Sequence, residues 1–211
     1  MTRGRFVTFE GGEGAGKSTA IAAAGQVLAR HGVPYFLTRE PGGTPLGEAL
    51  RALVLDPSRG TTCREAEVLM MFAARAQHVV EAIEPALAAG TWVLSDRFTD
   101  ASWAYQGGGR GVDPGLLATL ERYAAFDLQP DRTILLDVPV EEGLRRIEGR
   151  GQRDRMERES EEFFERVRAA YRARAAAMPA RFRVIDARQP LETVAAQVAA
   201  ELDALVAGAR S

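Results

Sequence analysis

Residues 11–19 of this 211-residue chain are Gly11-Gly12-Glu13-Gly14-Ala15-Gly16-Lys17-Ser18-Thr19, which contain the pattern G-x-x-x-x-G-K-[ST] of a phosphate-binding loop. Glycines let successive backbone N–H groups turn inward and approach a polyphosphate closely. A helix that follows such a loop points its positive end at the same anion. In this pattern the lysine reaches the β- and γ-phosphates, and the hydroxyl of the next residue binds Mg²⁺. The stretch therefore predicts an ATP site with Mg²⁺, in which Lys17 acts on the phosphates and Ser18 is a metal ligand.

The residues on either side of the loop supply the context that this motif needs. Residues 5–9 alternate apolar and polar side chains, which predicts a strand, and residues 19–29 are rich in Ala, Ile, Val and Leu, which predicts a helix. Lys17 is the only lysine among 27 Lys and Arg residues, and it stands where a compact ammonium group is required. A glycine-rich turn before an ordinary helix is the alternative, and this context disfavours it.

The composition is that of an ordinary globular protein. A net charge of −2 gives no global attraction to nucleic acid or to an anionic membrane, so neither is expected as a partner. The one cysteine, Cys63, excludes an internal disulfide and is typical of a reducing compartment. We find no signal peptide and no apolar run of the roughly 20 residues that span a bilayer, so a cytoplasmic location is expected.

Strands and helices are predicted to alternate along the chain. Further apolar runs predict strands at residues 33–38, 91–95, 132–138 and 182–186. The pattern Thr62-x-x-Glu65 is a capping box, which predicts that a long helix begins there and continues to about residue 89. Other helices are predicted at about residues 46–55, 113–125, 140–148, 160–178 and 190–206, while residues 98–111 form a polar, glycine-rich stretch.

This alternation predicts an α/β fold with a parallel sheet covered by helices on both faces. We expect the three-layer P-loop NTPase fold with a five-stranded parallel sheet, in one domain over residues 1–211. Ligands of such sheets bind at the carboxyl ends of the strands. Polar residues gather there: Glu10 follows the first strand, Arg39 the second, and Asp96 with Arg97 the third.

Asp96 and Arg97 each have a structural and a functional interpretation. A carboxylate at the end of an apolar strand is often a helix cap, but beside a phosphate-binding loop it is the position that holds Mg²⁺ through water. Arg97 could clamp a transferred phosphoryl group, and an ion pair with a neighbouring carboxylate is a fair alternative.

Residues 149–159 are dense in charge, with arginines at Arg150, Arg153, Arg155 and Arg158. Such a run is usually a solvated surface. Because the phosphate-binding loop carries no arginine of its own, we favour a short Arg-rich lid that closes over the phosphates.

Spacing alone does not decide the roles of three other residues. Phe72 and Arg75 lie three apart on the long helix and share a face, which suits a core Phe with a surface Arg at least as well as a site. Tyr105 could be a core tyrosine or the wall of a sugar pocket.

With these motifs in view, the chain resembles the bacterial thymidylate kinases over essentially its whole length. The resemblance rests on Phe9-Glu10-Gly11, residues 39–44 (Arg-Glu-Pro-Gly-Gly-Thr), 72–75 (Phe-Ala-Ala-Arg), 96–98 (Asp-Arg-Phe), 104–107 (Ala-Tyr-Gln-Gly) and the pattern Arg150-Gly151-x-x-Asp154-Arg155. The phosphate-binding loop marks a very large superfamily, whereas residues 39–44 and 104–107 are far more specific. Phe98 is a departure, because Tyr or His is common there, and Arg153 is an extra lid arginine.

The resemblance implies transfer of the γ-phosphoryl group of ATP to dTMP, with Mg²⁺, in a cytoplasmic homodimer. It implies catalytic roles for Lys17, Arg97, Arg150 and Arg155. For dTMP it implies that Arg39 and Arg97 bind the phosphate, Phe72 stacks on thymine and Arg75 bonds its O4. It also implies that Tyr105 packs on the deoxyribose, that Glu13 lies near the 3′-hydroxyl, and that Ser102 and Gln106 belong to the dTMP site.

Two other functions remain open from the sequence. One is a kinase for another pyrimidine monophosphate, such as UMP or CMP. The other is a nucleotide-gated switch, which has little use for an aromatic-and-arginine pocket or an Arg-rich lid.

Overall fold

The computed structural model describes residues 2–148 and 154–210. It contains a five-stranded sheet in the order β2-β3-β1-β4-β5, in which every pair of neighbouring strands is parallel. The strands are β1 (Phe6–Glu10), β2 (Tyr35–Arg39), β3 (Trp92–Asp96), β4 (Arg132–Asp137) and β5 (Phe182–Asp186). The predicted α/β fold with a parallel sheet is confirmed, and each predicted strand agrees with the structure to within a residue or two at its ends.

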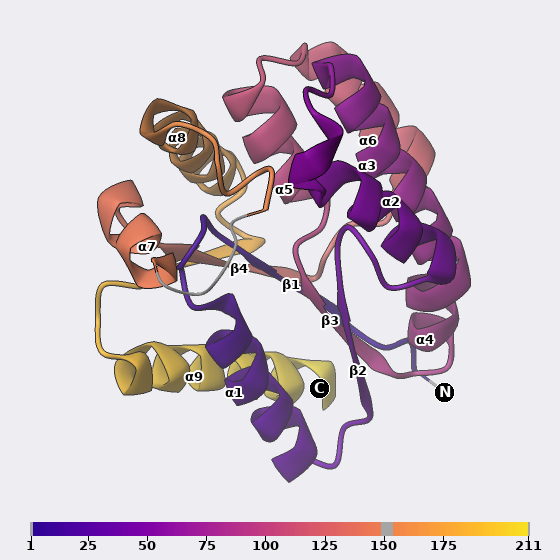
Figure 1. Ribbon diagram of the computed structural model, residues 1–211. Helices are drawn as coiled ribbons and strands as arrows, with labels where there is room; N and C mark the ends of the chain where they lie inside the picture. Colours follow the sequence, from indigo (N-terminus) through magenta and orange to yellow (C-terminus); the bar gives the residue numbers. More distant parts are fainter. Residues whose placement is uncertain (1, 149–153, 211) are drawn as a thin grey trace.

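Helices cover both faces of the sheet, so the molecule has three layers (Figure 1). The helices are α1 (Lys17–Arg30), α2 (Pro45–Leu55), η1 (Pro57–Arg59), α3 (Arg64–His78), η2 (Val79–Ile83), α4 (Glu84–Ala88), α5 (Thr99–Ser102), η3 (Trp103–Gly109), α6 (Pro114–Ala125), α7 (Val140–Ile147), α8 (Glu161–Ala177) and α9 (Leu191–Arg210). Helices α1 and α9 lie together on one face, and α2 to α8 lie on the other (Figure 1). None of the helices in the described ranges is long and apolar enough to cross a membrane.

Alternation along the strands separates the two cores. Val7 and Phe9 of β1 point toward α1 and α9, whereas Phe6 points toward η2 and α4. On β4, Leu135 packs with Phe163 and Val167 of α8, and its neighbours on either side face the opposite core. Both faces of the sheet are thus covered by helices, and the carboxyl ends of the strands are left free for a site.

The predicted capping box at Thr62 is wrong. The helix begins at Arg64, with Cys63 at the N-cap and no side-chain cap bond. Glu65 therefore lies one position too early to close the box, and its carboxylate accepts a hydrogen bond from Arg64 Nε at 2.7 Å. The long helix itself is present, but it contains the π-helical turn η2 just before Pro85, where proline cannot donate the usual backbone bond.

The glycine-rich stretch at residues 98–111 is mostly helical. It forms α5 and then the π-helical segment η3. Its glycines serve close packing on α8: a Cβ on Gly108 would lie 2.8 Å from the carbonyl oxygen of Arg166 and 2.6 Å from the Cβ of Ala170. This contact brings the residues of η3 under the carboxyl end of the sheet.

Candidate active site

The phosphate-binding loop connects β1 to α1. Gly16 is the N-cap of α1 in a left-handed conformation (φ 89°), which a glycine adopts without strain. No side chain caps this helix and its first turn carries no acidic residue. The first backbone N–H groups of α1 are therefore available to an anion.

Lys17 folds back over the loop. Its Nζ lies 3.4 Å from the carbonyl oxygen of Gly11 and 3.3 Å from that of Gly12. Burial, followed by the nearby positive charge of Arg97, lowers the pKa of Lys17, while Glu13 and Asp96 act in the opposite direction. A polyanion that binds beside this ammonium group would stabilise its charged form.

Asp96 ends β3 next to the loop. Its Oδ1 is buried and has no hydrogen-bond partner. Ser18 stands in the first turn of α1, which begins at Lys17, two residues before the predicted start. Residues 2–148 and 154–210 contain no cluster of three or more His, Cys, Asp or Glu side chains suited to a metal. A divalent cation that uses Asp96 and Ser18 therefore has to take its remaining oxygens from phosphates and water, which suits Mg²⁺.

Arg97 is the centre of the site. It has a positive φ of 71°, which is unusual for a side chain with a Cβ. Its Nη1 donates to the carbonyl of Gly11 and to Tyr171 Oη, and its Nη2 donates to Glu13 and to Tyr105 Oη, all at 2.8–3.0 Å. The guanidinium carbon also lies 4.7 Å from the centre of the Tyr105 ring. Four partners from three segments, namely the phosphate-binding loop, η3 and α8, fix this cation in place.

Glu13 forms an ion pair with Arg97. Burial alone would raise the pKa of Glu13, but Arg97 and Lys17, with a hydrogen bond from Tyr105, lower it below its ordinary value. The carboxylate accepts from Arg97 at 2.8 Å and from the hydroxyl of Tyr105 at 2.7 Å. Glu13 thus holds two predicted site residues together.

Tyr171 connects Arg97 to the buried Glu10. Tyr171 of α8 donates to Glu10 Oε2 at 2.7 Å, and Glu10 Oε1 accepts from the backbone N–H of Phe98. Glu10 is fully buried, and burial together with the negative charge of Asp100 raises its pKa to about 8. Nothing in the sequence pattern marks Tyr171, because its helix reads as an ordinary amphipathic one.

A pocket of about 200 Å³ opens beside these residues. Seven predicted site residues line it: Glu13, Lys17, Arg39, Asp96, Arg97, Tyr105 and Gln106. Arg39 is exposed and pairs with Glu48 at 3.0 Å. The pocket joins the phosphate-binding loop to the ends of β2 and β3, as the sequence predicted.

Phe72 does not line this pocket. Its ring is 3% exposed and packs with Val68, Val112 and Leu117 between α3 and α6. Its neighbour Met71 lines the pocket instead. One residue is about 100° of helical rotation, so Met71 and Phe72 point in different directions from α3, and stacking of Phe72 on thymine stays a prediction.

Arg75 and Ser102 lie behind the pocket wall. Arg75 is 1% exposed and donates to Glu40 Oε2 at 2.7 Å, to Ser102 Oγ at 3.0 Å and to the carbonyl of Phe98 at 2.9 Å. His78 bonds the second oxygen of Glu40 at 3.0 Å. Arg75 is thus the core of a buried polar network that holds the start of the residue 40–44 loop.

Gln106 presents an unused acceptor at the pocket. Its amide nitrogen donates to Glu67 at 2.9 Å, whereas its Oε1 is buried with no hydrogen-bond partner. Because Gln106 also lines the pocket, this oxygen can accept a bond from an N–H group of a ligand.

Arg155 is tied to the pocket wall rather than to the loop. Its guanidinium donates to the fully buried Glu67 at 2.6 Å and to the carbonyl of Val54 at 2.7 Å. This anchors the segment whose residues Asp154, Met156 and Glu157 line the pocket. Arg150 and Arg153, the other predicted lid arginines, lie outside the described residues.

Arg51 also lines the pocket, although no sequence motif marks it. It lies two turns into α2 and donates to the carbonyl of Pro41 at 2.9 Å. Burial, followed by the charge of Arg39, lowers the pKa of Arg51. Together with Arg39 and Arg97 it brings three guanidinium groups to the lining of the pocket.

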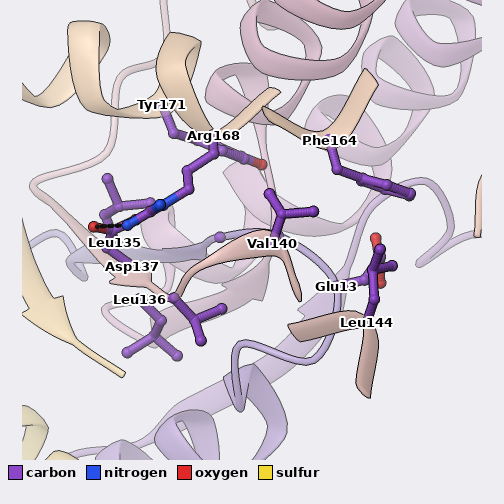
Figure 2. A pocket seen from close by; sticks show the side chains of 12 residues that line it. Glu13, Leu135, Leu136, Asp137, Val140, Leu144, Phe164, Arg168 and Tyr171 are labelled. Carbon is purple, nitrogen blue, oxygen red and sulfur yellow. Dashed lines mark hydrogen bonds and ion pairs between the residues drawn. The ribbon is translucent and has the colours of Figure 1, made fainter. Parts of the chain in front are cut away.

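A second, much smaller cavity of about 20 Å³ lies behind the phosphate-binding loop. Figure 2 shows Val140 and Leu144 of α7 facing Phe164 and Tyr171 of α8, with Glu13 at one side. Arg168 closes it by a two-bond ion pair with Asp137, at 2.7 and 3.1 Å. Helices α7 and α8 therefore flank the loop directly.

The chain is similar to proteins of one family over almost its entire length. Residues 9–198 match the family model described as thymidylate kinase. The chain is 57% identical over 204 residues to a thymidylate kinase of Chromohalobacter salexigens, covering 96% of each chain, and 51% identical over 208 residues to that of Methylococcus capsulatus, covering 99% of each. The solved structure of thymidylate kinase from Ehrlichia chaffeensis superposes with a TM-score of 0.76 at 33% identity, over 95% of this chain and 99% of that one.

Proposed function

This chain belongs to the thymidylate kinase family, and we propose that it transfers the γ-phosphoryl group of ATP to dTMP in the pocket between the phosphate-binding loop and the ends of β2 and β3, giving dTDP and ADP. The observation that carries this proposal is the joining of two sites by one arginine. Arg97 contacts the carbonyl of Gly11 in the loop and the Glu13–Tyr105 pair in the neighbouring pocket. A donor phosphate and an acceptor phosphate would meet at that point.

The attacking group is a phosphate oxygen of dTMP, which is already anionic at neutral pH. No general base is needed, so catalysis consists of positioning two polyanions and neutralising their charge. The carboxyl groups of Glu10 and Glu13 are occupied in holding Tyr171, Arg97 and Tyr105, which suits positioning rather than proton abstraction.

On the donor side, the backbone N–H groups of residues 11–19 and the ammonium group of Lys17 bind the β- and γ-phosphates. The free N-terminus of α1 and the lowered pKa of Lys17, caused mainly by burial, support this role. Ser18 and Asp96 would hold Mg²⁺, which neutralises charge on the phosphates when bound. The unpartnered buried oxygen of Asp96 supports that assignment.

On the acceptor side, Arg97 and Arg39 bind the dTMP phosphate, and Arg51 adds a third positive charge. Tyr105 packs on the sugar, and Glu13 lies near the 3′-hydroxyl. Phe72 stays the residue proposed to stack on thymine, with Met71 beside it at the pocket wall, and the free oxygen of Gln106 accepts from the N3–H of thymine. For Arg75 and Ser102 the contacts support an indirect role, since both lie behind the wall that the base would touch.

The roles of the lid arginines differ. The contacts of Arg155 support an anchor for the segment at residues 154–159, because its guanidinium is taken up by Glu67 and Val54. We retain Arg150 as the arginine that contacts the phosphates during transfer, on the strength of the family resemblance alone.

We also propose a homodimer formed through α2, α3 and α6, which lie side by side (Figure 1). Exposed apolar side chains support this face: Leu69, Val80, Leu116, Tyr123 and Phe126 are 46–81% exposed. A cytoplasmic location is proposed because the substrate ATP is abundant there and the exposed thiol of Cys63 suits a reducing compartment.

A coupled ADP-release assay with ATP, Mg²⁺ and a panel of dTMP, dUMP, UMP and CMP tests the function. We expect ADP release that depends on the acceptor, with dTMP used best. Equal turnover of UMP and dTMP would contradict the assignment to dTMP, and ADP release that ignores every acceptor would favour a nucleotide switch.

The Lys17→Ala variant is the control for the site. It should lower kcat by about 100-fold or more, because the group that neutralises the transferring phosphoryl is removed. The circular dichroism spectrum should stay that of the parent. A near-normal kcat would remove Lys17 from the mechanism.

A further inference from the structure

Helix α7 meets the phosphate-binding loop backbone to backbone. A Cβ placed on Gly143 of α7 would lie 2.4 Å from the carbonyl oxygen of Glu13. In the other direction, a Cβ on Gly14 would lie 2.1 Å from the carbonyl oxygen of Gly143. Two glycines that are distant in the sequence therefore pack so closely that neither position has room for a side chain.

A glycine at position 143 needs a reason of this kind. Residue 143 is inside α7 (Val140–Ile147), where alanine would favour the helix by about 1 kcal/mol over glycine. Gly143 has no positive φ that would require glycine. The close approach to the loop is the feature that excludes a larger residue.

Arg146 makes a second contact from the same helix. Its Nη1 lies 3.4 Å from the carbonyl oxygen of Gly14, and its Nη2 donates to the carbonyl of Ala187 at 2.9 Å and to Glu142 at 2.6 Å. Ala187 is joined in turn to Asp137 at the end of β4 by a backbone bond of 2.8 Å. The outer turn of the loop is thus connected to the frame of the sheet through Arg146.

The cavity behind the loop explains why such support matters. Val140 and Leu144 of α7 line that cavity together with Gly11 and Gly12 (Figure 2). The loop is not packed solidly on this side, so its position depends on the contacts at its rim. Those rim contacts include Glu13, whose carboxylate holds Arg97.

We propose that α7 is a brace for the phosphate-binding loop, with Gly143 and Arg146 as positioning residues that hold the outer turn at Glu13 and Gly14 in its phosphate-binding shape. Neither residue touches the phosphates. The proposal rests on the proposed function, since it assumes that the loop binds ATP.

The test compares the Kd for a non-hydrolysable ATP analogue with Mg²⁺, by calorimetry, in the parent and in three variants. Gly143→Ala should raise this Kd by about tenfold or more, because the methyl group displaces the outer turn. Arg146→Met should raise it by about threefold or more, with the KM for dTMP within about twofold of the parent. Arg145→Met is the matched control: its side chain is exposed on the same helix, and its Kd should stay that of the parent.

The outcomes are distinguishable. If the parent protein does not bind the analogue, the proposed function fails rather than the brace. If Gly143→Ala does not fold, as judged by circular dichroism, Arg146→Met decides, since it introduces no clash. A folded variant at either position with an unchanged Kd would overturn the proposal, as would equal losses of affinity for ATP and dTMP in Arg146→Met.

Discussion

Single residues show how far the acceptor phosphate site depends on groups that never touch it. Tyr171 contributes one hydroxyl, which accepts from Arg97 at 3.0 Å and donates to Glu10 at 2.7 Å. This bond orients a cation whose other partners come from the loop and from η3. Removing this hydroxyl should therefore weaken the binding of the dTMP phosphate by Arg97.

Tyr171→Phe should raise the KM for dTMP by about three- to tenfold and change the KM for ATP less, because Arg97 loses one of its four partners. Steady-state kinetics with each substrate varied in turn measures this split. Tyr35→Phe makes the same chemical change at a tyrosine that is 37% exposed at the start of β2, and it should behave as the parent. An unchanged KM for dTMP in Tyr171→Phe would count against the positioning role.

Arg155 has two possible roles, a contact to the phosphates or an anchor on Glu67, and a variant can distinguish them. A phosphate contact predicts that its loss lowers kcat, whereas an anchor on Glu67 predicts a rise in the KM for dTMP. From its bonds to Glu67 and Val54 we expect Arg155→Met to raise the KM for dTMP by about fivefold or more, with a smaller change in kcat. Arg172→Met, at an exposed arginine of α8, is the control, and a loss confined to kcat would restore the phosphate contact.

The loop, Asp96 and Arg97 were predictable at this scale because each follows a strand whose end is legible in the sequence. Which of Met71 and Phe72 lines the pocket was not predictable from the sequence. Both are large and apolar, and the direction of each depends on how α3 is rotated against α6. Arg51 and Tyr171 were missed for a related reason: they reach the site through tertiary packing of α2 and α8, which no local pattern encodes.

At the scale of elements, glycine was the main source of error. Gly107, Gly108 and Gly109 suggested an irregular stretch, yet they form part of η3. The lack of side chains on Gly108 and Gly109 lets α8 approach, and that on Gly107 makes room for Leu117 of α6. Composition alone cannot distinguish a glycine that breaks a helix from one that permits two helices to touch. The capping box at Thr62 failed for a different reason, since Cys63 rather than Thr62 is the N-cap of α3.

Gly108→Ala tests this packing. We expect a loss of about 1–3 kcal/mol in the free energy of unfolding, because the new methyl group would overlap the backbone of Arg166 and the side chain of Ala170. Urea denaturation measures it. Gly208→Ala, in α9 where nothing lies within 4 Å of the added Cβ, should be neutral or slightly stabilising. A stabilised Gly108→Ala would show that η3 and α8 are not in firm contact.

For the whole molecule, the buried acid at the end of β1 links stability to pH. Burial and the charge of Asp100 raise the pKa of Glu10 from 4.5 to about 8. The folded state therefore holds this proton more tightly than the unfolded state, so the stability from Glu10 is complete below about pH 4.5 and is lost as the pH rises through about 8.

Glu10→Gln imitates the protonated acid. Relative to the parent, the variant should gain at least about 1 kcal/mol of unfolding free energy between pH 5 and pH 9. Chemical denaturation at both pH values gives the difference. Exposed Glu192→Gln should show no such change, and a Glu10→Gln effect that is equal at the two pH values would refute the raised pKa.

The proposed homodimer is a second property of the whole molecule. Sedimentation equilibrium should give about twice the chain mass of 22.9 kDa. Tyr123→Asp should shift the protein toward the monomer because it places a charge in the centre of the apolar face. Val184→Asp, at an exposed position on β5, should leave the mass unchanged. A parent protein that sediments as a monomer would exclude the dimer.

One feature of this chain has a chemical consequence of its own. Since Lys17 is the sole lysine, amine-directed acylation has only two targets, the α-amino group and the ammonium group that faces the loop carbonyls. Acetylating that one side chain would abolish its charge. One acylation at Lys17, by a reagent or a metabolite, would thus inactivate the enzyme, with the α-amino group as the competing amine.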